Sequence, residues 1–116
     1  MLSRLKNKWV IITGASSGFG AAIATEFAKA GSCLLLGARR VERLEKIAEE
    51  CLRLGAASAD CQALDVSRTE SVNAFVHWVQ TKTGAVHFLI NNAGGALGLD
   101  TVAEGLDEDW ETMMQT

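Results

Sequence analysis

Short apolar runs alternate with stretches of helical periodicity along this chain. Residues 10–12, 34–36 and 88–90 are apolar throughout, and residues 59–64 form a weaker fourth run. Continuous apolar runs of this length are typical of strands that are covered on both faces. Such strands are joined through helices by right-handed crossovers, so the alternation predicts a parallel sheet between two layers of helices.

The segments between these runs are predicted to be helices. Apolar residues recur at helical spacing over residues 21–30, 41–54 and 71–83, and a glycine comes directly after each segment. A further helix is expected over residues 107–116, with Asp107 as its N-cap. Four strands in the order 3-2-1-4 would form the N-terminal half of a doubly wound, Rossmann-type α/β sheet.

The fourth predicted strand, at residues 86–90, is expected to have no fifth strand beside it, because no further apolar run follows. An unpaired apolar edge strand exposes backbone groups that promote association. We therefore expect the isolated chain to be difficult to keep in solution.

The composition fits one globular domain over residues 1–116, with 48% hydrophobic and 22% charged residues. The net charge of −3 provides no overall positive field for nucleic acid, and the apolar runs are too short to cross a membrane. Residues 1–12 lack the apolar core of a signal peptide. Cys33, Cys51 and Cys61 are odd in number and lack CxxC spacing, which favours buried thiols in a reducing cytoplasm over a metal site.

A glycine-rich turn, T-G-A-S-S-G-F-G over residues 13–20, lies between the first predicted strand and the first predicted helix. Glycine allows positive φ and close approach of a ligand, and a helix N-terminus attracts anions. Gly18 is expected where the backbone meets phosphate, in a conformation that requires positive φ. The spacing is neither that of a P-loop nor G-x-G-x-x-G, so a purely structural turn is the alternative. The position between strand and helix favours a dinucleotide site formed by Gly14, Ala15, Ser16, Ser17, Gly18, Phe19 and Gly20.

The pattern T-G-x-x-x-G-x-G resembles that of the short-chain dehydrogenase/reductase family. Two further motifs of that family follow in order, D-V at residues 65–66 and N-N-A-G at residues 91–94. Each comes directly after a predicted strand, and the resemblance covers essentially the whole chain. It implies an oxidoreductase that transfers a hydride between a nicotinamide cofactor and a hydroxyl or carbonyl group of a small molecule.

The same resemblance implies roles for individual residues. Asp65 and Val66 would contact the adenine ring, and Asn92, Ala93 and Gly94 would lie near a ribose. The alternative role of Asp65 is to cap the turn that follows its strand. Three other polar residues are interpreted as structural, namely Asn91, which would tie neighbouring strands together, and the histidines His77 and His87.

Within the family, the chain resembles the NADP-dependent 3-hydroxy acid (serine) dehydrogenase branch. The likeness rests on G-F-G at residues 18–20, A-R-R at 38–40, A-L-G at 96–98 and D-W-E-T-M at 109–113. It implies 3-hydroxy acids as the class of substrate.

The end of the second predicted strand distinguishes NADP from NAD. An NAD enzyme places an acidic residue there, about twenty residues after the glycine turn, to bind the ribose 2′-hydroxyl. This chain has Ala38 at that position, followed by Arg39 and Arg40. Such a surface pair is often only solvated charge, but a guanidinium can hold a 2′-phosphate through two parallel hydrogen bonds. We therefore predict NADP as the cofactor, with Arg39 and Arg40 at its 2′-phosphate.

Catalysis in the family uses a Ser, a Tyr-x-x-x-Lys pair and an Asn, with the tyrosine as general acid or base. This chain contains no tyrosine and stops at Thr116, so no catalytic residue is assigned. We expect either a chain truncated before the catalytic segment or one that a second segment completes, and we expect the full-length enzyme to be a homo-oligomer. The chain alone would bind nucleotide without turnover. The alternatives are a non-catalytic NADP-binding module or sensor, and a sugar-nucleotide epimerase, whose usual glycine spacing this turn does not follow.

Overall fold

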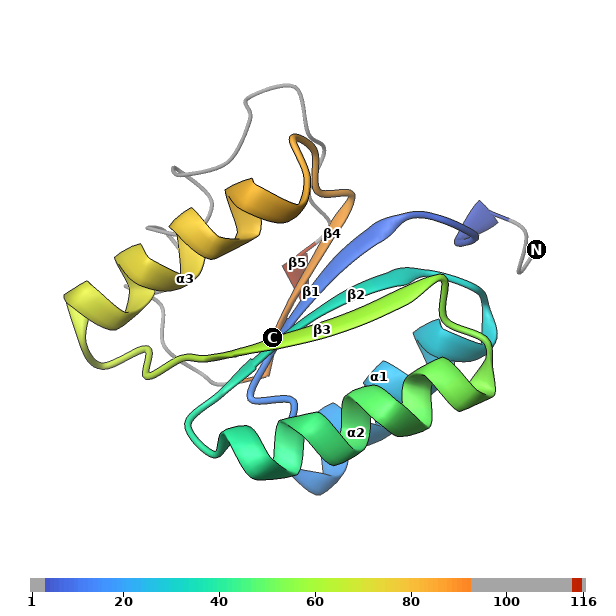
Figure 1. The fold of residues 1–116 in the computed structure, drawn as a ribbon, viewed down its shortest axis with the longest axis horizontal. Helices are drawn as coiled ribbons and strands as arrows, with labels where there is room; N and C mark the ends of the chain where they lie inside the picture. The colour runs from blue at the N-terminus through green and yellow to red at the C-terminus, as the bar shows by residue number, and fades with distance from the viewer. Residues whose placement is uncertain (1–3, 93–113, 116) are drawn as a thin grey trace.

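The computed structural model describes residues 4–92 and 114–115, and their strands form one parallel sheet in the order β3-β2-β1-β4-β5. The strands are β1 (Trp9–Thr13), β2 (Cys33–Ala38), β3 (Ser58–Ala63), β4 (Phe88–Asn91) and β5 (Met114–Gln115). The helices of these residues are α1 (Gly18–Lys29), α2 (Val41–Leu54) and α3 (Thr69–Lys82). Figure 1 shows α1 and α2 on one face of the sheet and α3 on the other. The predicted α/β fold and the order of its first four strands are confirmed.

Side chains of the central strands alternate between the two faces of the sheet, as the pleat requires. On one face, Ile12 and Leu36 belong to the core that α1 and α2 cover. On the other face, Ile11 and Leu35 pack with Phe75 of α3. All five side chains are fully shielded from solvent. This double coverage explains why β1 and β2 are apolar at consecutive positions.

The helices follow the predicted pattern, with differences at their N-termini. α2 spans the predicted residues, and Gly55 ends it in the left-handed conformation at φ 119°. α1 begins three residues earlier than predicted because Ser17 Oγ accepts a hydrogen bond from Gly20 N at 3.1 Å and caps the helix. α3 begins two residues earlier than predicted, and its buried residues are Val72, Phe75, Val76 and Val79. None of the helices in the described part of the chain is long and apolar enough to cross a membrane.

The fourth strand is not the edge of the sheet. Met114 and Gln115 form β5, which pairs in parallel with Leu89 and Ile90 of β4. The predicted helix over residues 107–116 is therefore wrong at these two positions, and so is the prediction that β4 lacks a neighbour. A buried strand presents backbone N–H and C=O groups that need partners, and this pairing supplies them. The remainder of that predicted helix lies outside the described residues.

Candidate functional site

A cleft of about 820 Å³ lies at the carboxyl edge of the sheet. β1 to β4 run parallel, so the loops that follow them leave from this edge. β1 lies between β2 and β4, and open α/β sheets bind ligands where the strand order reverses in this way. The cleft is lined by Gly14, Ser16, Ser17, Ala38, Arg39, Arg40, Arg43, Leu64, Asp65, Val66, Ser67 and Asn92.

The structure brings most of the predicted site residues together in this cleft. The predicted residues that line it are Gly14, Ser16, Ser17, Arg39, Arg40, Asp65, Val66 and Asn92. Four others of the glycine turn do not line it, namely Ala15, Gly18, Phe19 and Gly20. The remaining two, Ala93 and Gly94, lie outside the described residues, as do the stretches at 96–98 and 109–113.

The glycine turn is held by hydrogen bonds within itself and to β2. Gly14 has φ 65°, and its carbonyl oxygen accepts hydrogen bonds from Ser17 N at 3.2 Å and Ser17 Oγ at 3.0 Å. Ala15 is fully buried, and its N–H donates to Gly37 O at 3.2 Å. The positive φ predicted for Gly18 is wrong, because Gly18 is already the first residue of α1. Gly14 makes the left-handed turn instead.

Gly20 allows α1 to lie close to the turn. A Cβ atom at this position would overlap the Gly14 carbonyl oxygen and lie 2.7 Å from Asn92 Nδ2. Asn92 follows β4, and its Nδ2 donates to Gly14 O at 3.0 Å and to Ser17 Oγ at 2.8 Å. The Asn92 side chain therefore connects the end of β4 to the glycine turn, in addition to lining the cleft.

Gly18 and Phe19 present the first turn of α1 to solvent. Within the described part of the chain, no atom outside the chain neighbours of Gly18 and the backbone of its own helix lies within 4 Å of a Cβ atom built on Gly18. Phe19 is 72% exposed, which is unusual for a large aromatic side chain. The start of α1 is thus open to an approaching ligand.

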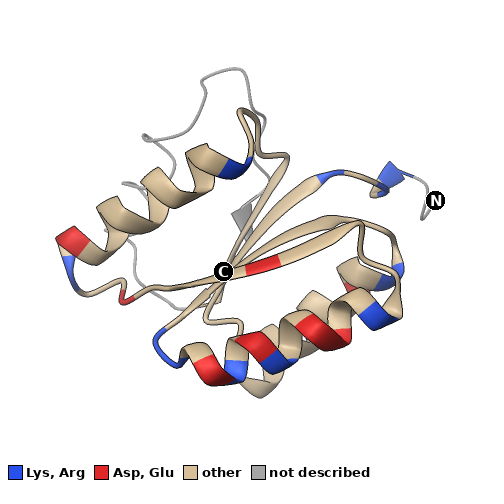
Figure 2. Ribbon diagram, viewed as in Figure 1, with Lys and Arg blue, Asp and Glu red and all other residues tan. Residues whose placement is uncertain are grey.

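The β2 side of the cleft is strongly basic. Arg39 and Arg40 follow β2, Arg43 lies in the first turn of α2, and all three are exposed cleft-lining residues. Figure 2 shows the basic segments between β2 and α2 and at the start of α2. The ion pairs of the described residues involve other basic side chains, such as Arg53 with Glu50 and Arg68 with Glu70.

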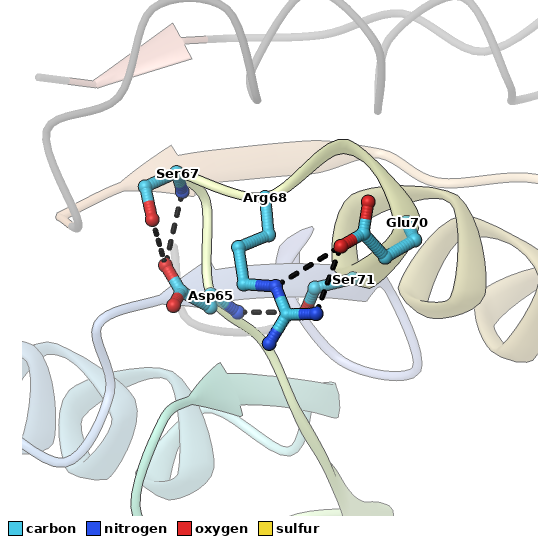
Figure 3. Close-up of polar contacts among 5 residues, drawn as sticks. All are labelled: Asp65, Ser67, Arg68, Glu70 and Ser71. Atoms are coloured by element: carbon cyan, nitrogen blue, oxygen red, sulfur yellow. Dashed lines mark hydrogen bonds and ion pairs between the residues drawn. The ribbon is translucent and has the colours of Figure 1, made fainter.

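Asp65 lines the cleft from the loop after β3, the strand next to β2, in a turn that Figure 3 shows in detail. Its Oδ1 accepts hydrogen bonds from Ser67 N at 3.0 Å and Ser67 Oγ at 2.6 Å, and its N–H donates to Ser71 Oγ at 2.8 Å. The Ser67 hydrogen bonds, with a smaller contribution from Arg39, lower the pKa of the Asp65 carboxyl. Asp65 therefore caps the turn before α3 and also lines the cleft, so the two predicted roles are compatible.

Two of the three residues interpreted as structural, Asn91 and His87, have structural contacts. Thr13 Oγ1 donates to the buried Asn91 Oδ1 at 3.0 Å, which joins the ends of β1 and β4 as predicted. His87 Nδ1 accepts a hydrogen bond from Trp9 N at 3.0 Å, and burial together with the charge of Lys8 lowers the pKa of this imidazole. His77 is exposed on α3. Within the described residues, no group of three or more potential metal ligands comes together.

Three cleft residues were not predicted from the sequence, namely Arg43, Leu64 and Ser67. Leu64 and Ser67 flank the D-V motif and belong to the same loop. Arg43 follows Arg40 by three residues, and residues three apart share one side of a helix. That spacing is the signal that could have indicated Arg43.

The chain matches the family model described as short chain dehydrogenase over residues 8–116. It is 40% identical over 116 residues to the NADP-dependent 3-hydroxy acid dehydrogenase of Schizosaccharomyces pombe, covering 99% of this chain and 45% of that protein. It is 39% identical over 95 residues to hydroxysteroid 11-beta-dehydrogenase 1-like protein B of Xenopus laevis, covering 81% of this chain and 33% of the relative.

A solved structure of L-sorbose reductase from Gluconobacter frateurii, complexed with NADPH and L-sorbose, is 31% identical with a TM-score of 0.81. The match covers 91% of this chain and 48% of that one. The fold, the cleft and these matches identify the class of protein: the chain belongs to the short-chain dehydrogenase family. It spans between a third and a half of the length of the three relatives described here.

Proposed function

We propose that this chain is the cofactor-binding half of an NADP(H)-dependent oxidoreductase, which transfers a hydride between nicotinamide and a hydroxyl or carbonyl substrate. The observation that supports this proposal best is the cleft itself. It has a capped glycine turn on its β1 side, arginines on its β2 side and no acidic residue at Ala38, the end of β2. This combination suits a dinucleotide with an additional phosphate on the adenosine ribose.

The glycine turn fits the pyrophosphate of such a cofactor. A helix N-terminus carries a partial positive charge and N–H groups without intrahelical partners. The turn leads directly into α1, and the space beside Gly18 is open. A phosphate group can therefore approach the first turn of α1 without displacing a side chain.

The opposite side of the cleft fits the adenosine 2′-phosphate. Ala38 contributes no charge, and Arg39 and Arg40 are available for charge-assisted hydrogen bonds. Asp65 and Val66 line the neighbouring wall, where the carboxylate can accept a hydrogen bond from the adenine amino group. The Ser67 hydrogen bonds lower the pKa of Asp65 and so favour its carboxylate form, which only accepts hydrogen bonds.

The bound cofactor would supply the hydride chemistry, and the residues of this chain would bind and orient it. No catalytic acid or base is assigned among them, because the chain contains no tyrosine. Likeness to the Schizosaccharomyces pombe protein supports 3-hydroxy acids as substrates. The state of the thiols supports a reducing compartment such as the cytoplasm, since Cys33, Cys51 and Cys61 are all free.

The test is a hydride-transfer assay on the protein that carries this chain. NADP is supplied with serine, other 3-hydroxy acids, or alcohols that lack the carboxylate, and NADPH formation is followed by absorbance. We expect NADPH to form fastest with the 3-hydroxy acids. Equal rates with simple alcohols would contradict the substrate class. Binding of NADP without turnover of any hydroxyl or carbonyl compound would favour a non-catalytic nucleotide-binding module.

A further inference from the structure

We propose that Arg43 is a further specificity-determining residue of the cleft, which binds the 2′-phosphate of NADP together with Arg39 and Arg40. This inference rests on the proposed function, because it assumes that NADP occupies the cleft. It adds a residue of α2 to a set that otherwise comes from the loop after β2.

The surroundings of Arg43 on α2 give the first argument. On a helix, side chains three or four positions apart are neighbours and form most local ion pairs. Within α2 the positions so related to Arg43 are Lys46 and Ile47, while Arg39 and Arg40 precede the helix, and none of these four residues is acidic. Arg43 therefore has no carboxylate neighbour along its own helix.

Arg53, near the other end of α2, shows the contrasting arrangement. Glu49 and Glu50 precede it by four and three residues, and Arg53 forms an ion pair with Glu50. Like-charge neighbours at helical spacing are unfavourable, so the arrangement around Arg43 suits a residue that meets an external anion.

The charge balance of the cleft gives the second argument. Arg39, Arg40 and Arg43 line it together with a single carboxylate, that of Asp65. Arg39 interacts electrostatically with Asp65, so part of its charge is already compensated. A 2′-phosphate carries about two negative charges near neutral pH. Arg39, Arg40 and Arg43 together balance the one carboxylate and the charges of the phosphate, although the chain as a whole has a net charge of −3.

The experiment compares Arg43→Gln with Arg53→Gln, the same substitution on the same helix but outside the cleft. Dissociation constants for NADP and NAD are measured by calorimetry on the protein that carries this chain, with Arg43→Lys as the conservative variant. Adenosine 2′-monophosphate serves as a probe of the phosphate alone. A thermal melt of each variant reports folding.

We expect Arg43→Gln to weaken NADP and adenosine 2′-monophosphate by about tenfold while NAD changes less than about twofold. Arg43→Lys should recover part of the loss, and Arg53→Gln should bind NADP as the unmodified protein does. Unchanged NADP binding by Arg43→Gln would overturn the inference, and so would equal losses for NADP and NAD. If Arg39→Ala still weakens NADP in that case, the proposed function stands without Arg43. If the unmodified protein does not prefer NADP and Arg39→Ala has no effect, both proposals fail.

Discussion

Arg39 and Asp65 face the same cleft from the ends of neighbouring strands, and their charges influence each other. Arg39 is exposed and forms no ion pair within the described residues, so it can turn toward a ligand without breaking a bridge. A hydrogen bond to a charged group contributes roughly 1.5–3 kcal/mol. That range is large enough to decide between two cofactors that differ by one phosphate.

We predict that Arg39→Ala weakens NADP binding by about ten- to a hundredfold and leaves NAD binding nearly unchanged. The reason is that only NADP carries the 2′-phosphate that the guanidinium would hold. Calorimetric titration with both nucleotides measures the effect. Equal losses of affinity for NADP and NAD would mean that Arg39 contacts a group that both nucleotides share.

Asp65 provides a prediction about pH. Its pKa is lowered in the folded protein, mainly by the Ser67 hydrogen bonds, whereas it is about 3.9 in an unfolded chain. Ionised Asp65 therefore stabilises the fold at pH values above about 4, and this stabilisation is lost as the pH falls through the lowered pKa. Ser67→Ala should raise the pKa of Asp65 toward its ordinary value.

Carboxyl titration by NMR measures this shift directly. Ser67→Thr is the matched control, because it retains the hydroxyl group and should retain the lowered pKa. If the pKa of Asp65 were the same in Ser67→Ala as in the unmodified protein, the Ser67 hydrogen bonds would not be its cause.

At the scale of elements, the junction between β1 and α1 combines a glycine that packs against the turn with one that has open space beside it. Gly20 lies against the Gly14 carbonyl and Asn92, whereas Gly18 has open space beside it. The two positions are only two residues apart, and both would be described as glycines of the same motif. We nevertheless expect a substitution of Gly20 to lower the stability of the fold and a substitution of Gly18 to impair nucleotide binding.

We predict that Gly20→Ala lowers the free energy of unfolding by about 1–3 kcal/mol, because the added methyl group overlaps the backbone of the turn. Gly18→Val should change stability by less than about 1 kcal/mol, since its side chain meets nothing, yet it should abolish nucleotide binding by filling the phosphate approach. Denaturant unfolding and calorimetry measure the two properties. These assignments would be contradicted if the Gly20→Ala variant had an unchanged free energy of unfolding, or if the Gly18→Val variant bound NADP with normal affinity.

At the scale of the whole molecule, the features that could be predicted were those with a local cause. The apolar runs of β1 and β2 reflect their burial on both faces, and the apolar spacing of α2 predicted that helix with both boundaries. The end of β2 indicated the basic side of the cleft from residues that are adjacent in the chain.

Of the features that were missed, the fifth strand depends on a contact between distant segments, whereas the start of α1 depends on a cap within the glycine turn. Met114 and Gln115 form a strand because β4 offers them backbone partners, and nothing in two residues indicates this pairing. Gly14 rather than Gly18 has positive φ because the Ser17 cap starts α1 inside the motif.

The central claim is that the cleft at the carboxyl edge of this sheet binds NADP in preference to NAD. The most direct test is calorimetric titration of the unmodified protein that carries this chain with each nucleotide under identical salt conditions. Because Arg39, Arg40 and Arg43 line the cleft and Ala38 carries no acidic side chain, we predict that NADP binds at least about tenfold more tightly. Equal affinities, or tighter binding of NAD, would contradict the claim.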